Sequence, residues 1–180
     1  MSLARHLKIL LVFLFAVTAA TECYADVKPY GEYQVKAVFL LNLTSFVSWP
    51  AESFSAPAEP FRVVILGDDP FGAVLDKAIK GESVQGHPIV IERRTYREGA
   101  QPCHLLFISP SLKRKVPEIL ANVKNMPLLT VADQAGFCRQ GGMINLIYRN
   151  GRVLIEANAR AAENSGLQIN SKLLRLSIPY

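Results

Sequence analysis

The stretch FRVVILGDDPFGAVLDKAI, residues 61–79, decides the fold of this chain. Phe61 to Leu66 are large apolar or β-branched residues except for Arg62, a composition that predicts a buried strand. A Gly-Asp-Asp-Pro turn follows, in which Asp69 is a candidate helix cap and Pro70 a candidate first helical residue. The apolar residues after Pro70 keep helical spacing up to the glycine at position 81. A buried strand followed at once by a helix is typical of α/β proteins.

The same alternation continues downstream. Further short apolar runs at residues 88–92, 103–108 and 128–131 predict strands. A helix is predicted to open at Ser109-Pro110-Ser111, with Ser109 as its cap. Strands that alternate with helices form mainly parallel sheets with helices on both faces. The sequence therefore predicts a three-layer α/β fold built around a mostly parallel sheet.

The segments before and after these alternating strands and helices show other patterns. MINLIY at 143–148 and RVLIEA at 152–157 flank Arg-Asn-Gly, and Asn-Gly between apolar runs is a strong hairpin signal. We expect this C-terminal antiparallel hairpin at one edge of a mixed sheet in a single domain. A helix is expected over 159–165, and 171–177 fits a helix or a strand. Before the first strand, residues 26–50 predict a largely buried helix that stops at Trp49-Pro50.

The first 25 residues predict a secretory signal peptide. Arg5 and Lys8 precede the apolar run Ile9 to Val17, and small residues follow. The run is about half of the ~20 residues that span a bilayer. Cleavage after Ala25, or alternatively after Ala20, fits the small-residue rule and leaves an exported domain at about 26–180.

Composition narrows the functional classes. With Arg5, Lys8 and Glu22 removed, 18 basic and 14 acidic residues remain of the full chain's 20 and 15. This mild positive charge is interspersed, without the clustered basic helix expected of a nucleic-acid-binding protein. Cys103 and Cys138 form an even pair, which favours a disulfide in an oxidising compartment. Two separate buried thiols remain the alternative.

The residue patterns of catalytic, metal and cofactor sites are not found in the sequence. The turn after the first strand has neither a Gly-x-Gly-x-x-Gly loop nor a Walker lysine. A phospho-receiver site would need an aspartate where Ser109 ends the third strand. His87 and His104 have no partners at metal-ligand spacing, and no nucleophile elbow is present. We expect neither an enzyme nor a bound cofactor or metal.

Three features are candidate contact sites. Arg93 and Arg94 begin a basic cluster that suits an anion or a protein partner, or forms a solvated loop. Glu156 lies inside an apolar strand, so it is either at a solvated edge or paired with a cation, for which Arg152, Arg175 and the cluster at 93–97 are candidates. Gly141-Gly142 predicts a sharp turn or a close backbone approach.

Three stretches together resemble the YfiR-like periplasmic family. They are YQVKAVFLLNL from Tyr33, followed by Trp49-Pro50; CHLLFIS from Cys103; and Phe137 to Leu176, with GGMINL, NGRVLIEAN and LLRLS. The resemblance implies a small periplasmic regulator that restrains an inner-membrane diguanylate cyclase, or acts on a sensor kinase, through the partner's periplasmic part. It also implies that an outer-membrane peptidoglycan-binding lipoprotein sequesters the regulator, and that the output is cyclic di-GMP and biofilm.

The resemblance also gives expectations for single residues. It places Glu156 near a pocket that takes a small molecule or an aromatic side chain. It puts the family's local disulfide pattern in doubt for Cys138, because Ile144 and Leu146 stand where a partner cysteine is expected. We expect the first helix or the last segment, with Leu173, Leu174 and Leu176, to offer the apolar docking surface. A homodimer is the base-rate assembly. The alternative function is a periplasmic small-ligand binder or hydrolase that uses the strand-end crevice.

Overall fold

The structure, a computed structural model, describes residues 30–180 of the chain. The predicted signal peptide, its two candidate cleavage sites and Cys23 lie outside these residues. Within the described residues, every helix is too short or too polar to cross a membrane.

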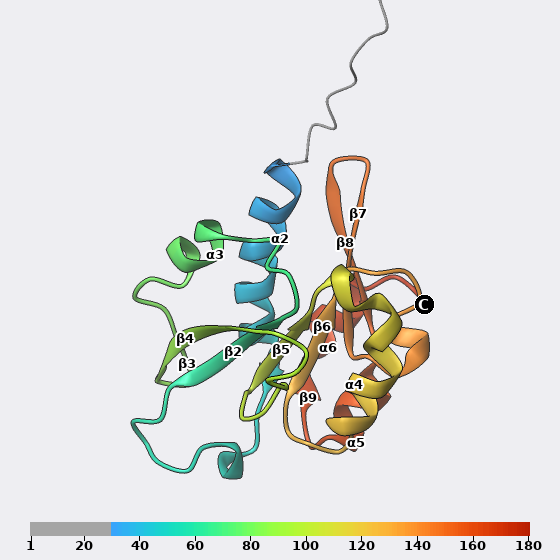
Figure 1. The fold of residues 1–180 in the computed structure, drawn as a ribbon. Helices are drawn as coiled ribbons and strands as arrows, with labels where there is room; N and C mark the ends of the chain where they lie inside the picture. Colours follow the sequence, from blue (N-terminus) through green and yellow to red (C-terminus); the bar gives the residue numbers. More distant parts are fainter. Residues whose placement is uncertain (1–29) are drawn as a thin grey trace, which may run out of the picture. The chain divides into compact units, whose positions relative to one another are not determined.

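A seven-stranded mixed sheet forms the centre of the domain (Figure 1), in the order β3-β4-β2-β5-β6-β7-β8. The five central strands run parallel, whereas β3 and β8 pair antiparallel at the two edges. The predicted mostly parallel mixed sheet with an edge hairpin is therefore confirmed. The strands are β2 (Phe61–Leu66), β3 (Ser83–Val84), β4 (His87–Arg94), β5 (Leu105–Ile108), β6 (Leu129–Ala132), β7 (Ile144–Arg149) and β8 (Arg152–Ala157).

Helices cover both faces of this sheet, as predicted. One apolar cluster joins alternate residues of the strands to α2, α5 and α6, and a second joins the opposite residues to α4 and Phe137. The α-helices are α2 (Tyr30–Leu43), α3 (Ala73–Ala78), α4 (Val116–Asn122), α5 (Ala159–Asn164) and α6 (Ser171–Leu176). The 3-10 turns are η1 (Thr44–Phe46), η2 (Ala51–Ser53), η3 (Pro110–Lys115) and η4 (Cys138–Gln140).

The predicted bounds of two helices were wrong. The first helix, α2, ends at Leu43, and the chain then forms β1 (Val47–Ser48), which pairs antiparallel with β9 (Gln168–Ile169) in a separate two-stranded sheet. Strands of two residues are too short to leave a periodic pattern. The next α-helix, α3, begins at Ala73 rather than Pro70, because Gly72 has a φ of +53°, outside the helical region. The last segment is a helix, α6.

The hairpin is confirmed, and its turn explains the Asn-Gly sequence. Asn150 and Gly151 have φ values of +52° and +74°, the pair of left-handed conformations that a type I′ turn requires. β7 pairs with β8 at six positions, but with β6 only at Ile144 and Asn145. The hairpin therefore extends beyond the end of β6 (Figure 1).

The close approach predicted at Gly141-Gly142 is found at the second glycine. A Cβ at Gly142 would lie 2.2 Å from the ring of Phe137, which is itself completely buried. No side chain fits at this position without moving the ring. The glycine thus lets the backbone pass over Phe137 and enter β7.

Candidate functional site

A buried ion pair lies at the carboxyl end of β6. Asp133 follows this strand, and its Oδ2 accepts hydrogen bonds from Lys36 Nζ at 2.9 Å and from the Tyr33 hydroxyl at 2.8 Å. Lys36 also pairs with Glu32 one turn earlier in α2. The three α2 residues are three and four positions apart, so they share one face of the helix. This face ties the start of α2 to the central sheet.

Burial controls the electrostatics of the pair. The side chains of Lys36 and Asp133 are 3% and 1% exposed. Burial raises the pKa of the Asp133 carboxyl, because a low-dielectric surrounding disfavours its charged form, while Lys36 and Tyr33 oppose this rise. Burial and the bond to Asp133 also hold the pKa of Tyr33 far above its usual value. The hydroxyl is therefore a fixed donor.

A second set of polar groups continues across the neighbouring strands. Asn145 of β7 is completely buried; its Oδ1 accepts the backbone N–H of Gln134 at 3.0 Å. Its Nδ2 donates to Oε2 of Glu156 in β8 at 2.8 Å, and the two residues are register partners. We call Asp133, Gln134, Asn145 and Glu156 the polar row.

The polar row has unused hydrogen-bonding capacity. Oδ1 of Asp133 and both side-chain polar atoms of Gln134 are buried and have no hydrogen-bond partner among the described residues. Gln134 is only 7% exposed. Buried polar atoms are nearly always paired, so three such atoms on adjacent residues mark a place where a polar group can bind.

Of the two alternatives for Glu156, pairing with a cation is not found: none of the candidate arginines forms an ion pair with it within residues 30–180. Arg93 binds Asp69 at 2.6 Å and Asp76 at 2.8 Å, which fastens β4 to the turn and helix after β2. Arg94 pairs with Glu92 and donates to the backbone oxygen of Gln101 at 2.7 Å. Internal carboxylates therefore occupy much of the predicted basic cluster.

The other two arginines also lie away from Glu156. Arg152 begins β8 opposite Arg149, next to the hairpin turn. Arg175 is exposed on α6, where it donates to Ser171 Oγ at 3.4 Å. A strand carboxylate bonded to a buried asparagine needs no cation, because the amide supplies the hydrogen bond that the carboxylate lost on burial.

The last helix offers less apolar surface than expected. Leu173 is 2% exposed and packs in the core cluster shared with α2, so it is not accessible to a partner. Leu174 is half-buried, and Leu176 is 65% exposed. A helix of six residues cannot expose all three leucines, because at least one of them has to pack against the core, and here that residue is Leu173.

The favoured disulfide is not found; Cys103 and Cys138 are both free and buried. Cys103 lies near Glu92 and Arg94 of β4, whereas Cys138 lies near Asn145 and Glu156 of β7 and β8. Cys103 stands two residues before β5, Cys138 lies in η4 before β7, and β6 separates β5 from β7 in the sheet. Neighbouring strands are about 4.8 Å apart, and a disulfide needs Cα atoms within about 7 Å. Burial raises the pKa of each thiol to about 12.

The histidines serve packing. The Phe54 ring stacks on His87 at 3.8 Å and on His104 at 4.7 Å between ring centroids. Among residues 30–180, His, Cys, Asp and Glu form no group of three that could hold a metal ion.

Sequence reasoning missed most of the polar row. Glu156 stood out as a charge in an apolar strand, and the same signal was available for Lys36, in the run VKAVFLL, and for Asn145, in MINLIY. Asp133 and Gln134 carry no such signal, because they follow a strand in a segment that reads as a polar connection.

Comparison with known proteins adds one finding. A family model described as YfiR/HmsC-like matches residues 33–178. The match begins at Tyr33, which binds Asp133, and ends at Ile178, which forms a β-bridge with Glu156. No curated protein matches the chain.

Proposed function

Because this chain belongs to the YfiR/HmsC-like family, we propose that it is a periplasmic regulator that binds the periplasmic part of an inner-membrane signalling protein. The observation that carries the proposal is the extent of the family match, which includes almost every element of the described domain. The predicted signal peptide supports export of this domain.

The proposed partner is a diguanylate cyclase, or alternatively a sensor kinase, which the regulator represses. Repression needs the regulator to bind the inactive conformation of the partner more tightly than the active one. Each tenfold preference shifts that equilibrium by about 1.4 kcal/mol. Bound to a cyclase, the regulator lowers cyclic di-GMP and biofilm formation. An outer-membrane peptidoglycan-binding lipoprotein would relieve repression by competing for the regulator.

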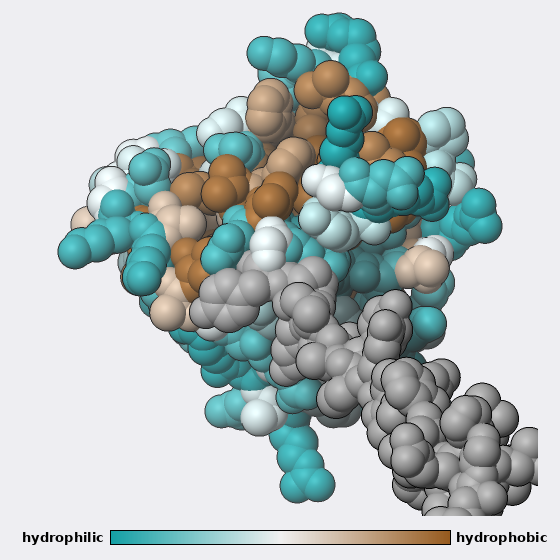
Figure 2. Space-filling view, turned by 90° about the horizontal axis from the view of Figure 1, so that it is seen from above, coloured by the Kyte–Doolittle hydropathy of each residue, from teal (hydrophilic) through white to brown (hydrophobic). Residues whose placement is uncertain are grey.

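The end of the domain where α2 begins and the hairpin extends is the proposed docking surface. Val35 and Val38 of α2 are 38% and 51% exposed. Ile147 and Leu154, which are register partners in the hairpin, are half-buried. Figure 2, which looks down on this end, shows hydrophobic residues, in brown, gathered between hydrophilic ones, in teal. An apolar centre with a polar rim is the usual composition of a protein interface.

We also propose that the protein acts by binding and not as an enzyme. The carboxyl ends of parallel strands are where α/β enzymes place catalytic groups. Here Asp69 binds Arg93, Ser109 caps η3, and Asp133 binds Lys36 and Tyr33, so these groups are engaged in holding the fold.

The proposal is tested in cells of the source bacterium. Deleting the gene is expected to raise cyclic di-GMP and biofilm, and the full chain supplied in trans is expected to lower both. The matched control is the chain without residues 1–25, which keeps the described domain but lacks the predicted signal peptide and is expected not to complement. Complementation by the leaderless chain would contradict action from outside the cytosol. Unchanged cyclic di-GMP after deletion would contradict the diguanylate cyclase as the partner.

A second candidate function rests on the unpartnered polar atoms of Asp133 and Gln134. A small polar molecule bound there would make the protein a ligand binder that uses the strand-end crevice. Native mass spectrometry separates the candidates, since a metabolite that remains bound to the purified protein, and is lost in Gln134→Leu, supports the binder.

A further inference from the structure

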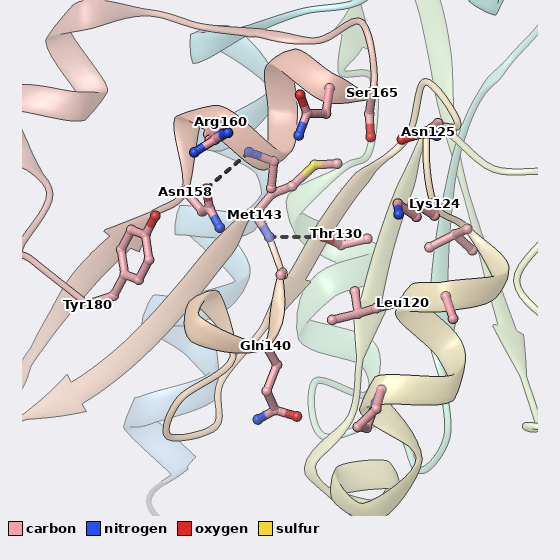
Figure 3. Close-up of a pocket in the computed structure, with 16 residues that line it drawn as sticks. Leu120, Lys124, Asn125, Thr130, Gln140, Met143, Asn158, Arg160, Ser165 and Tyr180 are labelled. Atoms are coloured by element: carbon pink, nitrogen blue, oxygen red, sulfur yellow. Dashed lines mark hydrogen bonds between the residues drawn. The ribbon is translucent and has the colours of Figure 1, made fainter.

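A pocket of about 520 Å³ lies away from the polar row, next to the start of β7 (Figure 3). α4 forms one side, α5 forms another, and the turn that contains Gln140 and Gly141 closes a third. Small-molecule sites have volumes of about 300 to 1,000 Å³, so the pocket is large enough for an organic ligand. Nothing in the proposed regulatory function depends on it.

Hydrogen bonds fix the walls of this pocket. The backbone N–H of Met143 donates to Thr130 Oγ1 at 3.1 Å. Asn158 accepts the N–H of Ala161 at 3.0 Å and donates to the backbone oxygen of Cys138 at 3.1 Å. These bonds join β6, β7, η4 and α5 around the pocket, which is therefore formed before any ligand arrives. A preformed site spares the ligand the cost of ordering it.

The pocket lining is a mixture of apolar and polar side chains, and its charged side chains are both cations. Leu120, Met143 and Ala161 contribute apolar lining, and Lys124 and Arg160 are its charged side chains. Lys124 lies in the turn after α4 and Arg160 lies in α5, and the two stand on either side of Met143 in Figure 3. No aspartate or glutamate lines the pocket, and neither cation forms an ion pair within residues 30–180, the terminal carboxylate included.

We propose that this pocket binds a small organic anion, with its carboxylate or sulfonate at Lys124 and Arg160 and its apolar body against Met143 and Leu120. The charges favour an anion, because two cations without an acidic partner attract a negative group by Coulomb forces. Arginine adds directed hydrogen bonds to a planar carboxylate. The apolar part of the lining favours an organic ligand over a simple inorganic ion, because the methionine and leucine surfaces gain only from apolar contact.

Methionine methyl groups provide a direct test. The chain has three methionines; Met143 lines the pocket, and Met126 is exposed outside its lining. We would label the purified protein with ¹³C at the methionine methyls, assign them by Met→Leu variants, and titrate 1-anilinonaphthalene-8-sulfonate. A saturable shift of the Met143 signal is expected, with Met126 unmoved. The uncharged analogue N-phenyl-1-naphthylamine is expected to bind at least about tenfold more weakly.

Charge variants complete the test. Lys124→Gln and Arg160→Gln are each expected to weaken binding of the sulfonate about tenfold, because a hydrogen bond to a charged group is lost. Both side chains are exposed, so the fold should survive, as the unchanged spectrum of the free variant would verify. Lys113→Gln removes an exposed lysine outside the pocket and should change nothing. An unmoved Met143 signal, equal affinity for the uncharged analogue, or an equal loss in Lys113→Gln would overturn the proposal.

Discussion

At the scale of single residues, the Lys36–Asp133 pair has the largest expected effect on stability. Replacing Lys36 with methionine leaves a carboxylate that is 1% exposed without its cation. Breaking a buried pair on one side costs about 3 kcal/mol or more, because the remaining charge is uncompensated. We therefore expect Lys36→Met to lower the free energy of unfolding by about 3 kcal/mol, measured by urea denaturation.

A double-mutant cycle is the control for this prediction. Asp133→Asn alone should also destabilise the protein, since Lys36 would keep only Glu32 as a charged partner. Lys36→Met with Asp133→Asn should cost clearly less than the sum of the two single variants, because the pair is coupled. An additive result would contradict a direct interaction.

His104 predicts a pH dependence of stability. Burial lowers the pKa of His104 from its ordinary value near 6.5, and its Nδ1 accepts the backbone N–H of Arg62 at 2.9 Å, a bond that only the neutral ring can form. Above about pH 6.5 the ring is neutral in both states and the stability is complete. Below about pH 6.5, His104 takes up a proton in the unfolded chain but not in the folded protein, where its pKa is lower. The free energy of unfolding therefore falls as the pH decreases, until the pH reaches the pKa of His104 in the folded protein.

Urea titrations between pH 8 and pH 5 measure this effect. The slope from one proton cannot exceed about 1.4 kcal/mol per pH unit. His104→Gln, which cannot titrate, should flatten the profile in this window. An equally steep profile in the variant would assign the effect to another group.

Gly142 predicts a large effect from one methyl group. Gly142→Ala places a carbon about 2 Å from the Phe137 ring, so the ring or the backbone must move, and overpacking of this kind costs about 1–3 kcal/mol. Gly31→Ala is the matched control. Gly31 lies in α2, a Cβ there would meet nothing within 4 Å, and alanine is favoured over glycine in helices by up to about 1 kcal/mol. Thermal unfolding should therefore move in opposite directions in the two variants.

At the scale of elements, the hairpin is the part most suited to a partner. Ile147→Glu or Leu154→Glu changes a half-buried side chain beyond the end of β6, so we expect the fold to persist and repression to be lost. The measurement is cyclic di-GMP in the deletion strain that carries each variant. Glu98→Lys, in the exposed loop after β4, is the control for a charge change elsewhere. Full repression by both hairpin variants would remove the hairpin from the docking surface.

How well each element could be predicted depends on its length. FRVVIL and the two hairpin strands were predictable because six residues show a clear composition, and Asn-Gly requires a particular turn. β1 and β9 have two residues each and are held together by pairing alone. The end of α2 was missed because Thr44 to Phe46 continue as a 3-10 turn, which keeps the apolar pattern of a helix.

At the scale of the whole molecule, the cysteines and the signal peptide give one prediction. The exported protein should begin at Asp26 or Thr21 and should be 25 or 20 residues shorter than the full chain. Cys103 and Cys138 should not react with a thiol reagent in the native protein, because both are buried with raised pKa values, and should react after denaturation without reductant. Intact mass and thiol titration measure this. A mass two units below that of the dithiol would reveal a disulfide.

The candidate site was less predictable than the fold. The polar row lies on β7, β8 and the residues after β6, and Asp133 joins it to Lys36 of α2. From Lys36 to Glu156 these residues are up to 120 positions apart along the chain. Single strands and helices have local signals, whereas a hydrogen bond between them depends on sheet order and register. Glu156 was noticed because its charge conflicts with its neighbours; its partner, Asn145, follows only from the register of β7 on β8.

The short pairing between β6 and β7 is a weak boundary within the central sheet. Only Val131 with Ile144 and Ala132 with Asn145 join the two strands, reinforced by the bonds from Met143 to Thr130 and from Gln134 to Asn145. On one side of this boundary the parallel strands carry α4, and on the other the hairpin leads into α5. A force applied at the hairpin turn acts on the β6–β7 contact from a distance, because the hairpin extends beyond β6. A partner bound at the turn is therefore expected to separate β7 from β6 before other strands, and the hydrogen bonds of the polar row resist this separation.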